Sequence, residues 1–301
     1  MSTDQQWDIV TGVGLTALAV AAARAAESER PDALIHDPHA SVLVAAAQSP
    51  VPFPLSDGTA AAQAAPAAEG VDATDQELWN GASDYVGVRS RVFDDYFLRA
   101  SADGIRQAVI LASGLDTRPY RLAWPSGTVC YELDQPAIID FKSATLEGEG
   151  TAPSCDHRPV RVDLRHDWGA ALEAAGFDAS RPTAWLAEGL LPYLPPDAET
   201  RLFEEVTRLS ADGSRFAVEQ IDNVNDLFDD PVLRERSKAF GMDASSLFPA
   251  GERAPVESRL AGLGWQLEHR AVPESAAALG RPVPRLPMLT DHVTHTFGRL
   301  G

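Results

Sequence analysis

The sequence has few cysteines and almost no lysine. Cys130 and Cys155 are its only cysteines, which excludes a disulfide framework and a zinc site built from four thiolates. This cysteine usage is typical of a reducing compartment, so we expect a cytoplasmic protein. Lys142 and Lys238 are the only lysines, and the formal net charge at pH 7 is −19. Such a charge repels phosphate groups and anionic lipids, so we predict no nucleic-acid and no membrane partner.

Long apolar segments are also missing. The apolar run from Val13 to Ala23 has 11 residues, whereas a membrane-spanning helix needs about 20. Asp4 and Asp8 stand where a secretory signal would carry Lys or Arg. We therefore interpret the run as a helix of a folded domain that continues to about Arg24.

The first part of the chain, residues 1–104, is predicted to be a helical extension. Asp37 followed by Pro38 is typical of a helix start, and this helix should reach about Ala47. Apolar spacing predicts one or two helices over 77–102. The intervening segment from Ser49 to Gln76 is rich in Ala and Pro and poor in large apolar side chains. Such a segment cannot bury enough surface to hold itself firmly, so it is either a linker or a mobile lid. Because helices are expected on both sides of it, we expect a lid.

The second part, residues 105–301, alternates between short apolar runs and helical periodicity, which predicts a parallel sheet covered by helices on both faces. The five expected strands are 107–112, 128–133, 158–162, 183–188 and 214–219. The helices expected between them are 117–122, 136–147, 167–175 and 196–210. An insertion around 221–255, a helix near 256–262 and two further strands at 265–270 and 292–297 follow. The fold class is therefore α/β, a Rossmann-like and mostly parallel seven-stranded sheet.

An open parallel sheet binds its ligand at the carboxyl ends of its strands, so the residues just past each run are the candidate site. The first run ends in ASGLDTR, in which Gly114 lets a ligand approach the backbone and the next helix offers free N–H groups. Ser113 and Asp116 flank this glycine. Ala112, Gly114 and Thr117 occupy the three glycine positions of the dinucleotide fingerprint. With only one glycine present, this turn is poorly suited to bind a pyrophosphate.

The second and third runs end in carboxylates. Asp134 follows Gly114 by 20 residues, and a carboxylate there can accept hydrogen bonds from both hydroxyls of a ribose. Asp163 and Leu164 offer a carboxylate and a backbone N–H, which together match the edge of an adenine. Helix caps or turn residues are the alternative for Asp134, and a cap for the helix at Asp167 is the alternative for Asp163.

Two further positions complete the candidate site. Glu188 ends the fourth run, and because a buried Glu is rare without a partner, it indicates a polar ligand or cation nearby. Tyr193 follows it on the same side of the crevice. Arg89 and Arg91 are two residues apart and thus lie on different faces of a helix, so one can face inward. The alternative is two solvated arginines paired with the acidic residues at 94 and 95.

Five segments in order make the chain resemble a known family. RSRVFDDYF, VILASGLDTRPYRL, YELDQP, VDLRHDW and AEGLLPYLPP are similar to the successive motifs of class I S-adenosylmethionine-dependent methyltransferases of the leucine carboxyl methyltransferase-like group, above all its actinobacterial branch. The resemblance covers almost the whole chain. It departs at Ala112, where many members have glycine, and in the Ala- and Pro-rich segment at 49–76.

The resemblance implies S-adenosyl-L-methionine as the cofactor. It implies that Arg89 holds the cofactor carboxylate, that Gly114 and its neighbours Ser113 and Asp116 pass under the methionine portion, and that Glu188 lies near the methionine amine. It further implies that Asp134 binds the ribose and that the pair at 163 and 164 binds the adenine.

The methyl acceptor is expected to be a carboxylate on a small molecule or at a peptide C-terminus, oriented by Tyr193 and by an arginine of the segment 88–91. The alternative for Tyr193 is a packing residue under the helix that begins near Pro196. Methyl transfer is an in-line displacement, and a carboxylate is already ionised near pH 7, so it needs no general base. None of the seven histidines ends one of the first five runs, and His166, His36 and His39 are the nearest candidates. A hydroxyl of a natural product is the alternative acceptor.

Two other classes remain open at this point: a nicotinamide-dependent dehydrogenase, which the missing glycines disfavour, and a noncatalytic nucleoside-binding protein. The acidic residues at 222–230 lack the order of a calcium loop, so we predict no metal. The sequence does not indicate an oligomeric state.

Overall fold

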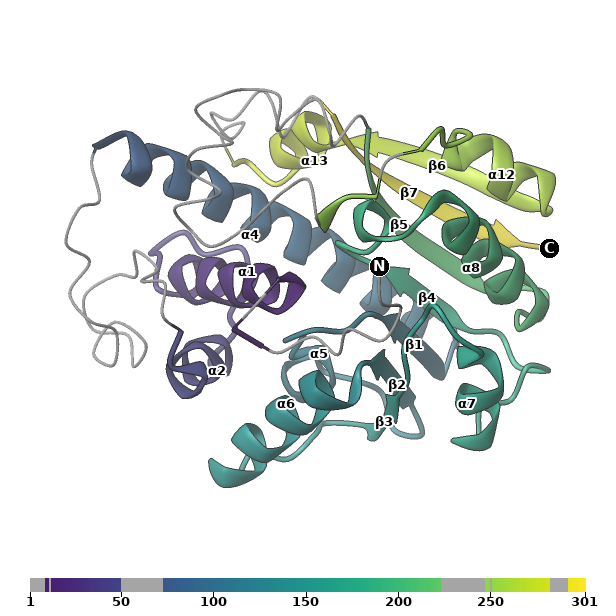
Figure 1. Cartoon of the computed structure of the whole chain (residues 1–301), viewed down its shortest axis with the longest axis horizontal. Helices are drawn as coiled ribbons and strands as arrows, with labels where there is room; N and C mark the ends of the chain where they lie inside the picture. The colour runs from purple at the N-terminus through teal and green to yellow at the C-terminus, as the bar shows by residue number, and fades with distance from the viewer. Residues whose placement is uncertain (1–8, 11, 50–72, 223–246, 250, 282–291) are drawn as a thin grey trace.

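The computed structural model describes residues 9–10, 12–49, 73–222, 247–249, 251–281 and 292–301 (Figure 1). Residues 50–72 of the expected lid lie outside this part of the chain, and so does most of the insertion expected at 221–255. In the described residues no helix is both long and apolar enough to cross a membrane.

Three helices form the N-terminal region: α1 (Val13–Ser28), α2 (Ala40–Ala47) and α4 (Ala73–Ala102). The predicted end of the first helix near Arg24 is wrong, because no Gly or Pro stops the helix there and α1 runs one turn further. The predicted start of the second at Asp37 is also wrong. The Asp37 carboxylate accepts hydrogen bonds from the N–H groups of His39 and Ala40, and the helix begins only at Ala40. The helix expected from 77 begins four residues earlier.

The sheet has seven strands in the order β3-β2-β1-β4-β5-β7-β6. All neighbours are parallel except β7, which runs antiparallel to both β5 and β6. The strands are β1 (Gln107–Leu111), β2 (Val129–Asp134), β3 (Asp156–Arg161), β4 (Ala184–Ala187), β5 (Arg215–Ile221), β6 (Trp265–Ala271) and β7 (Val293–Leu300). The predicted α/β fold class is confirmed, with strand ends that differ from expectation by at most three residues.

Helices connect the strands and cover both faces of the sheet (Figure 1). They are α5 (Arg118–Arg121), α6 (Pro136–Gly148), α7 (Trp168–Ala174), α8 (Pro196–Arg208) and α12 (Val256–Gly262). A short 3-10 helix, η1 (Leu191–Tyr193), and α13 (Val272–Ala278) were not expected. Pro273 in the first turn of α13 and Glu274, whose carboxylate accepts a hydrogen bond from the Ala271 N–H, are start signals that the sequence does carry.

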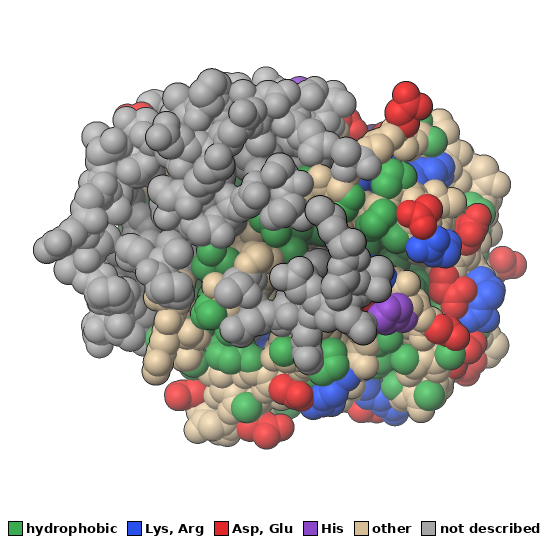
Figure 2. All heavy atoms as spheres, viewed as in Figure 1, with side chains coloured by type: hydrophobic (Ala, Val, Ile, Leu, Met, Phe, Trp, Pro, Cys, Tyr) green, Lys and Arg blue, Asp and Glu red, His purple; other side chains and the backbone are tan. Residues whose placement is uncertain are grey.

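Alternating residues of β1 separate the core into two layers. Val109 and Leu111 pack with α7, α8 and α12 on one face, whereas Ala108 and Ile110 pack with α4 on the other. Fully buried side chains such as Trp185 and Phe93 fill these layers. On the face seen in Figure 2, acidic and basic side chains are intermixed over the region of α8 and α12.

Strand order reverses between β1 and β4, because the chain runs outward from β1 to β3 and then returns to β4 on the other side. A crevice opens at the carboxyl ends of strands at such a point. Every site residue predicted from the strand ends lies at this edge of the sheet.

Candidate functional site

A cavity of about 560 Å³ lies at the carboxyl ends of β1 to β5. This size is within the range of small-molecule and cofactor sites. All nine residues predicted from the sequence line it: Arg89, Ser113, Gly114, Asp116, Asp134, Asp163, Leu164, Glu188 and Tyr193. The structure therefore brings the predicted residues together around one space.

The turn after β1 forms the floor of this cavity. Ala112 and Gly114 both adopt positive φ, +51° and +49°, a conformation that costs an alanine more than a glycine. Helix α1 lies directly against the turn, since a Cβ on Gly114 would stand 3.4 Å from the Cβ of Ala17. Below it, the buried Lys142 ammonium donates to the Ser113 hydroxyl and the Asp116 carbonyl, both at 3.2 Å.

Asp134 ties the end of β2 to this turn. One carboxylate oxygen accepts the Gly114 N–H at 2.6 Å, and the other accepts the Gln135 N–H at 2.7 Å. Burial raises the pKa of Asp134, although these two N–H groups act against the rise. The cap of α6 is Gln135, so the helix-cap alternative for Asp134 is wrong.

Asp163 stands two residues beyond β3. Its carboxylate accepts the Arg165 backbone N–H at 2.9 Å and pairs with the Arg165 guanidinium at 2.5 Å. Burial acts to raise the pKa of Asp163, but the contacts with Arg165 hold it below its usual range. Asp167, not Asp163, caps α7, so the cap alternative is wrong here too.

Glu188 lies between two buried arginines. One of its oxygens is 2.8 Å from Arg89 Nε and the other is 2.7 Å from a terminal nitrogen of Arg118. Burial alone would raise the pKa of Glu188, yet Arg118 and Arg89 lower it, so this carboxylate is ionised. Arg118 also pairs with Asp116 at 2.5 Å and Asp94 at 2.7 Å.

The two candidate arginines of α4 do face different ways. Arg89 is buried and faces the cavity, as one of the two was expected to do, whereas Arg91 is exposed and pairs with Asp95 at 3.0 Å. The alternative pairing of solvated arginines with residues 94 and 95 holds only for Arg91. Asp94 instead binds Arg118 and Arg121.

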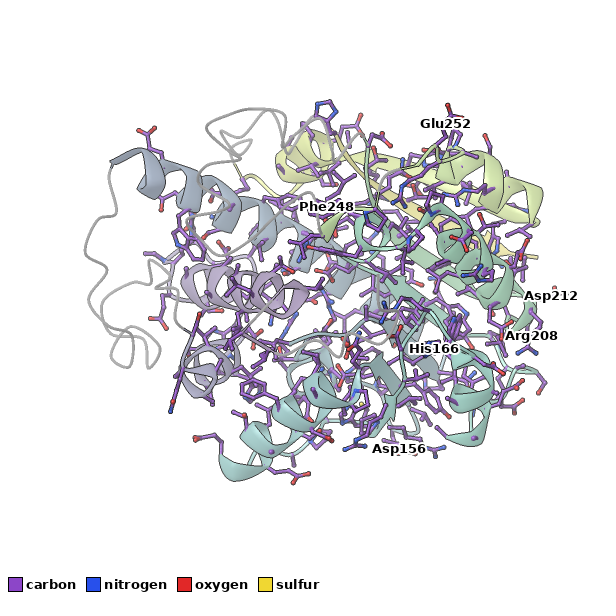
Figure 3. All side chains as sticks on the ribbon, viewed as in Figure 1. Asp156, His166, Arg208, Asp212, Phe248 and Glu252 are labelled. Carbon is purple, nitrogen blue, oxygen red and sulfur yellow. The ribbon has the colours of Figure 1, made fainter. Side chains whose placement is uncertain are left out.

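Tyr193 ends η1 and closes the cavity on the side opposite β3. Its hydroxyl donates to the Thr16 hydroxyl of α1 at 3.2 Å, and its ring lies 5.2 Å from that of Phe248, centroid to centroid. Burial raises the pKa of Tyr193, so the phenol keeps its proton and remains a donor. In Figure 3, Phe248 lies within the outline of the molecule, whereas Arg208 and Asp212 lie at its edge.

Sequence reasoning missed Glu219 and Tyr85. Glu219 lies near the end of β5 and is 1% exposed, and Tyr85 faces it from α4. The Tyr85 hydroxyl donates to one Glu219 oxygen, and the Gly189 N–H donates to the other at 2.6 Å. Burial raises the pKa of Glu219 to about 8. A glutamate inside an apolar strand was the available signal, the same one that pointed to Glu188.

The helical extension also reaches the site through a network that the sequence did not reveal. Arg24 of α1 pairs with Asp37 at 2.9 Å and donates to the Leu115 carbonyl at 2.6 Å. Asp37 accepts a further hydrogen bond from the Thr117 hydroxyl at 2.7 Å. These contacts fix α1 and the segment before α2 on the turn after β1.

No histidine or lysine is among the described residues that line the cavity. The three histidines considered as bases, His166, His36 and His39, are therefore not placed on its wall. In the described part of the chain, no group of three or more His, Cys, Asp or Glu side chains is arranged to hold a metal ion.

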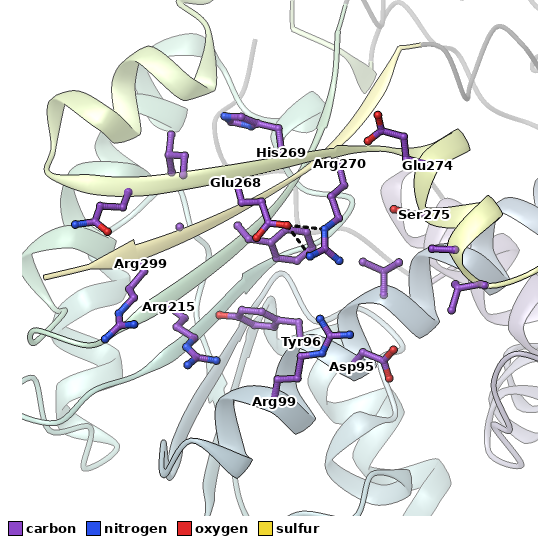
Figure 4. Close-up of a pocket in the computed structure, with 17 residues that line it drawn as sticks. Asp95, Tyr96, Arg99, Arg215, Glu268, His269, Arg270, Glu274, Ser275 and Arg299 are labelled. Carbon is purple, nitrogen blue, oxygen red and sulfur yellow. Dashed lines mark hydrogen bonds and ion pairs between the residues drawn. The ribbon is translucent and has the colours of Figure 1, made fainter.

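A second cavity, of about 930 Å³, lies between α4, β6, β7 and α13 (Figure 4). Arg215, the first residue of β5, lines it, so it opens toward the amino end of that strand. Its wall includes the Arg270–Glu268 ion pair at 2.6 Å. None of the nine predicted site residues lines it.

Comparison with known proteins gives the family. The model of the leucine carboxyl methyltransferase family matches residues 17–207. A protein of Saccharopolyspora erythraea, named as a candidate S-adenosyl-L-methionine-dependent methyltransferase, is 49% identical over 94% of this chain and 93% of its own. A protein of Mycobacterium avium with the same name is 45% identical over 98% of this chain and 93% of its own.

The fold has a counterpart among solved structures. A candidate methyltransferase from Thermobifida fusca superposes with a TM-score of 0.53 at 18% identity, over 86% of this chain and 93% of its own. These findings favour the methyltransferase interpretation over the dehydrogenase and the noncatalytic binding protein. The chain belongs to the leucine carboxyl methyltransferase family and is an S-adenosyl-L-methionine-dependent methyltransferase.

Proposed function

We propose that this protein transfers a methyl group to a carboxylate on a small molecule or at a peptide C-terminus. The observation that supports this most strongly is the lining of the cavity: it contains two tyrosine hydroxyls and several arginines but, among the described residues, no histidine or lysine to act as a base. A carboxylate is ionised near pH 7 and reacts without losing a proton, so orientation and exclusion of water suffice.

The cavity residues fit the cofactor. Asp134 uses one lone pair of each oxygen for a backbone N–H, which leaves the remaining lone pairs to accept from the two hydroxyls of a ribose. Asp163 and the Leu164 N–H would meet the adenine edge. Asp134 and Asp163 both lie on the β3 side of the crevice. We therefore place the nucleoside of the cofactor there and its methionine portion over β1 and β4.

The methionine portion would lie on the turn formed by Ser113, Gly114 and Asp116. Arg89 uses Nε and one terminal nitrogen for Glu188 and Glu219, so its other terminal nitrogen can donate to the cofactor carboxylate. The ionised Glu188 would accept from the methionine amine. When bound, the sulfonium supplies an electrophilic methyl group.

The acceptor would then occupy the part of the cavity near β4, β5 and α1. Tyr193 lies in this part, held in place by Thr16 and Phe248, and its hydroxyl hydrogen would turn from Thr16 to the acceptor on binding. Val20, Val86 and Ile221 add an apolar wall. We infer that Tyr193 orients an acceptor with an apolar body and one anionic end.

A hydroxyl acceptor is a second candidate, and Glu219 is the observation that favours it. A buried carboxyl group whose pKa is about 8 has the proton affinity of a general base working near neutral pH. Such a base would remove the hydroxyl proton as the oxygen attacks the methyl carbon.

The chemistry of the product separates the two candidates. The enzyme is incubated with isotope-labelled S-adenosyl-L-methionine and a panel of acids and alcohols, and products are identified by mass spectrometry before and after mild alkaline hydrolysis. We expect a methyl group that is released by base, as from an ester. A methyl group that survives as an ether would refute the carboxylate acceptor.

A further inference from the structure

Tyr85 and Glu219 form a hydrogen-bonded pair on the wall of the cavity, and neither has a role in cofactor binding as assigned above. Tyr85 projects from α4 and Glu219 from β5, and both line the same cavity as Tyr193. The Asp134 and Asp163 carboxylates lie at the ends of β2 and β3, on the other side of β1. The pair therefore lies away from the proposed nucleoside position, on the side where we place the methionine portion and the acceptor.

Arg89 lies between two carboxyl groups. Its Nε is 2.8 Å from Glu188, and one terminal nitrogen donates a hydrogen bond to each oxygen of Glu219 at 3.3 Å, which is longer than a typical N–H···O distance. His295 of β7 stands opposite Glu219 in the antiparallel register, and burial lowers the pKa of His295 to about 4. This histidine is therefore neutral near pH 7.

In the described part of the chain, the remaining titratable groups are directed toward other partners. Asp222, just past β5, is near Glu257 and His292 rather than Glu219. Across β4, Gly189 contributes only its backbone N–H, which donates to Glu219 at 2.6 Å. Burial is thus the main influence on this carboxyl group, and it favours the protonated form at neutral pH.

We propose that Tyr85 donates a hydrogen bond to the acceptor carboxylate, and that protonated Glu219 is the positioning residue that makes this possible. A protonated Glu219 donates to the Tyr85 oxygen, which frees the phenolic hydrogen to point into the cavity. An ionised Glu219 instead accepts that hydrogen and adds a second negative charge beside the acceptor. This inference rests on the proposed carboxylate acceptor.

The proposal makes acceptor binding depend on pH. A small carboxylic acid stays ionised from pH 7 to pH 9, so a change in its affinity over this range reports a group of the protein. If only the form with protonated Glu219 binds, and its pKa is about 8, the dissociation constant should rise about tenfold from pH 7 to pH 9.

The test is calorimetric titration of the S-adenosylhomocysteine complex with phenylacetate and hexanoate at pH 7, 8 and 9, and with the uncharged 2-phenylethanol. In wild type we expect the tenfold weakening for both acids. Glu219→Gln can still donate from its amide to Tyr85, so its dissociation constant should stay within about fivefold of wild type at pH 7 and lose the pH dependence. Tyr85→Phe should bind both acids about tenfold more weakly at pH 7.

Binding of S-adenosylhomocysteine itself should change by less than about twofold in both variants, which also shows that they are folded. The proposal is wrong if affinity for the acids is constant from pH 7 to pH 9, if neither acid binds, or if 2-phenylethanol binds as tightly as phenylacetate. It is also wrong if Glu219→Gln abolishes turnover while acid binding is unchanged, because that result identifies a general base. An ester product together with constant affinity would refute this pair and leave the proposed carboxylate acceptor intact.

Discussion

Replacing Asp134 by Ala tests the cofactor site most directly. The substitution removes the acceptor of the Gly114 and Gln135 N–H groups, which are held at 2.6 and 2.7 Å, and of the proposed ribose hydroxyls. A hydrogen bond to a charged group contributes about 1.5 to 3 kcal/mol. In the variant, water can take the place of Asp134 for one ribose hydroxyl, so the net loss is about one such hydrogen bond. This loss should weaken S-adenosylhomocysteine binding by about 10- to 160-fold.

Calorimetry with two further variants identifies the cause. Asp134→Asn keeps the shape and one oxygen acceptor, so its affinity should lie between those of wild type and Asp134→Ala. Asp140→Ala removes an exposed aspartate of α6 that pairs with Arg161 on the surface, and it should bind like wild type. An Asp134→Ala variant that is folded and binds within twofold of wild type would refute the assignment of Asp134 to the cofactor.

Three other variants probe the acceptor wall and the buried charges. Tyr193→Phe removes one oriented donor, so turnover should fall about tenfold while cofactor affinity stays within twofold; equal losses in both would contradict an acceptor role. Asp37→Asn leaves Arg24 buried without its carboxylate and should lower the free energy of unfolding in urea by about 3 to 5 kcal/mol, and a loss below 1 kcal/mol would show that the pair is dispensable. The folded-state pKa of Glu219 is raised to about 8. Between about pH 5 and pH 8 the folded protein therefore keeps the Glu219 proton while the unfolded chain loses it, and the free energy of unfolding falls as pH rises. Glu219→Gln should therefore gain stability over wild type by up to about 1.4 kcal/mol per pH unit in that window, and a constant difference would indicate an ordinary pKa.

The strand ends could be predicted because continuous apolar runs identify buried parallel strands. Val109 and Leu111 pack on one face of the sheet and Ala108 and Ile110 on the other, so β1 is continuously apolar after its first residue. Once the strands are placed, the carboxyl ends meet at one edge, and the position of Asp134 follows from counting residues. Boundaries of the N-terminal helices were predicted less well, since nothing in the sequence stops α1 at Arg24.

The partners of the buried charges could not be predicted in the same way. Arg118 meets Glu188, which is 70 residues away, and Arg24 meets the Leu115 carbonyl, which is 91 residues away. Periodicity reports only which face of an element is apolar and carries no information about such pairs. Glu219 is different, because the rule that a buried Glu needs a partner applied to it as well as to Glu188.

The contacts of α1 explain why the helical extension and the sheet form a single site. A Cβ on Gly114 would approach Ala17, Thr16 accepts from the Tyr193 hydroxyl, and Arg24 donates to Leu115, so α1 contacts residues of the site along about two turns. The turn after β1 thus forms the floor of the cavity, and α1 covers it. Since both the proposed cofactor turn and the proposed acceptor tyrosine depend on this helix, differences in α1 among related chains would change acceptor specificity without any change at the strand ends.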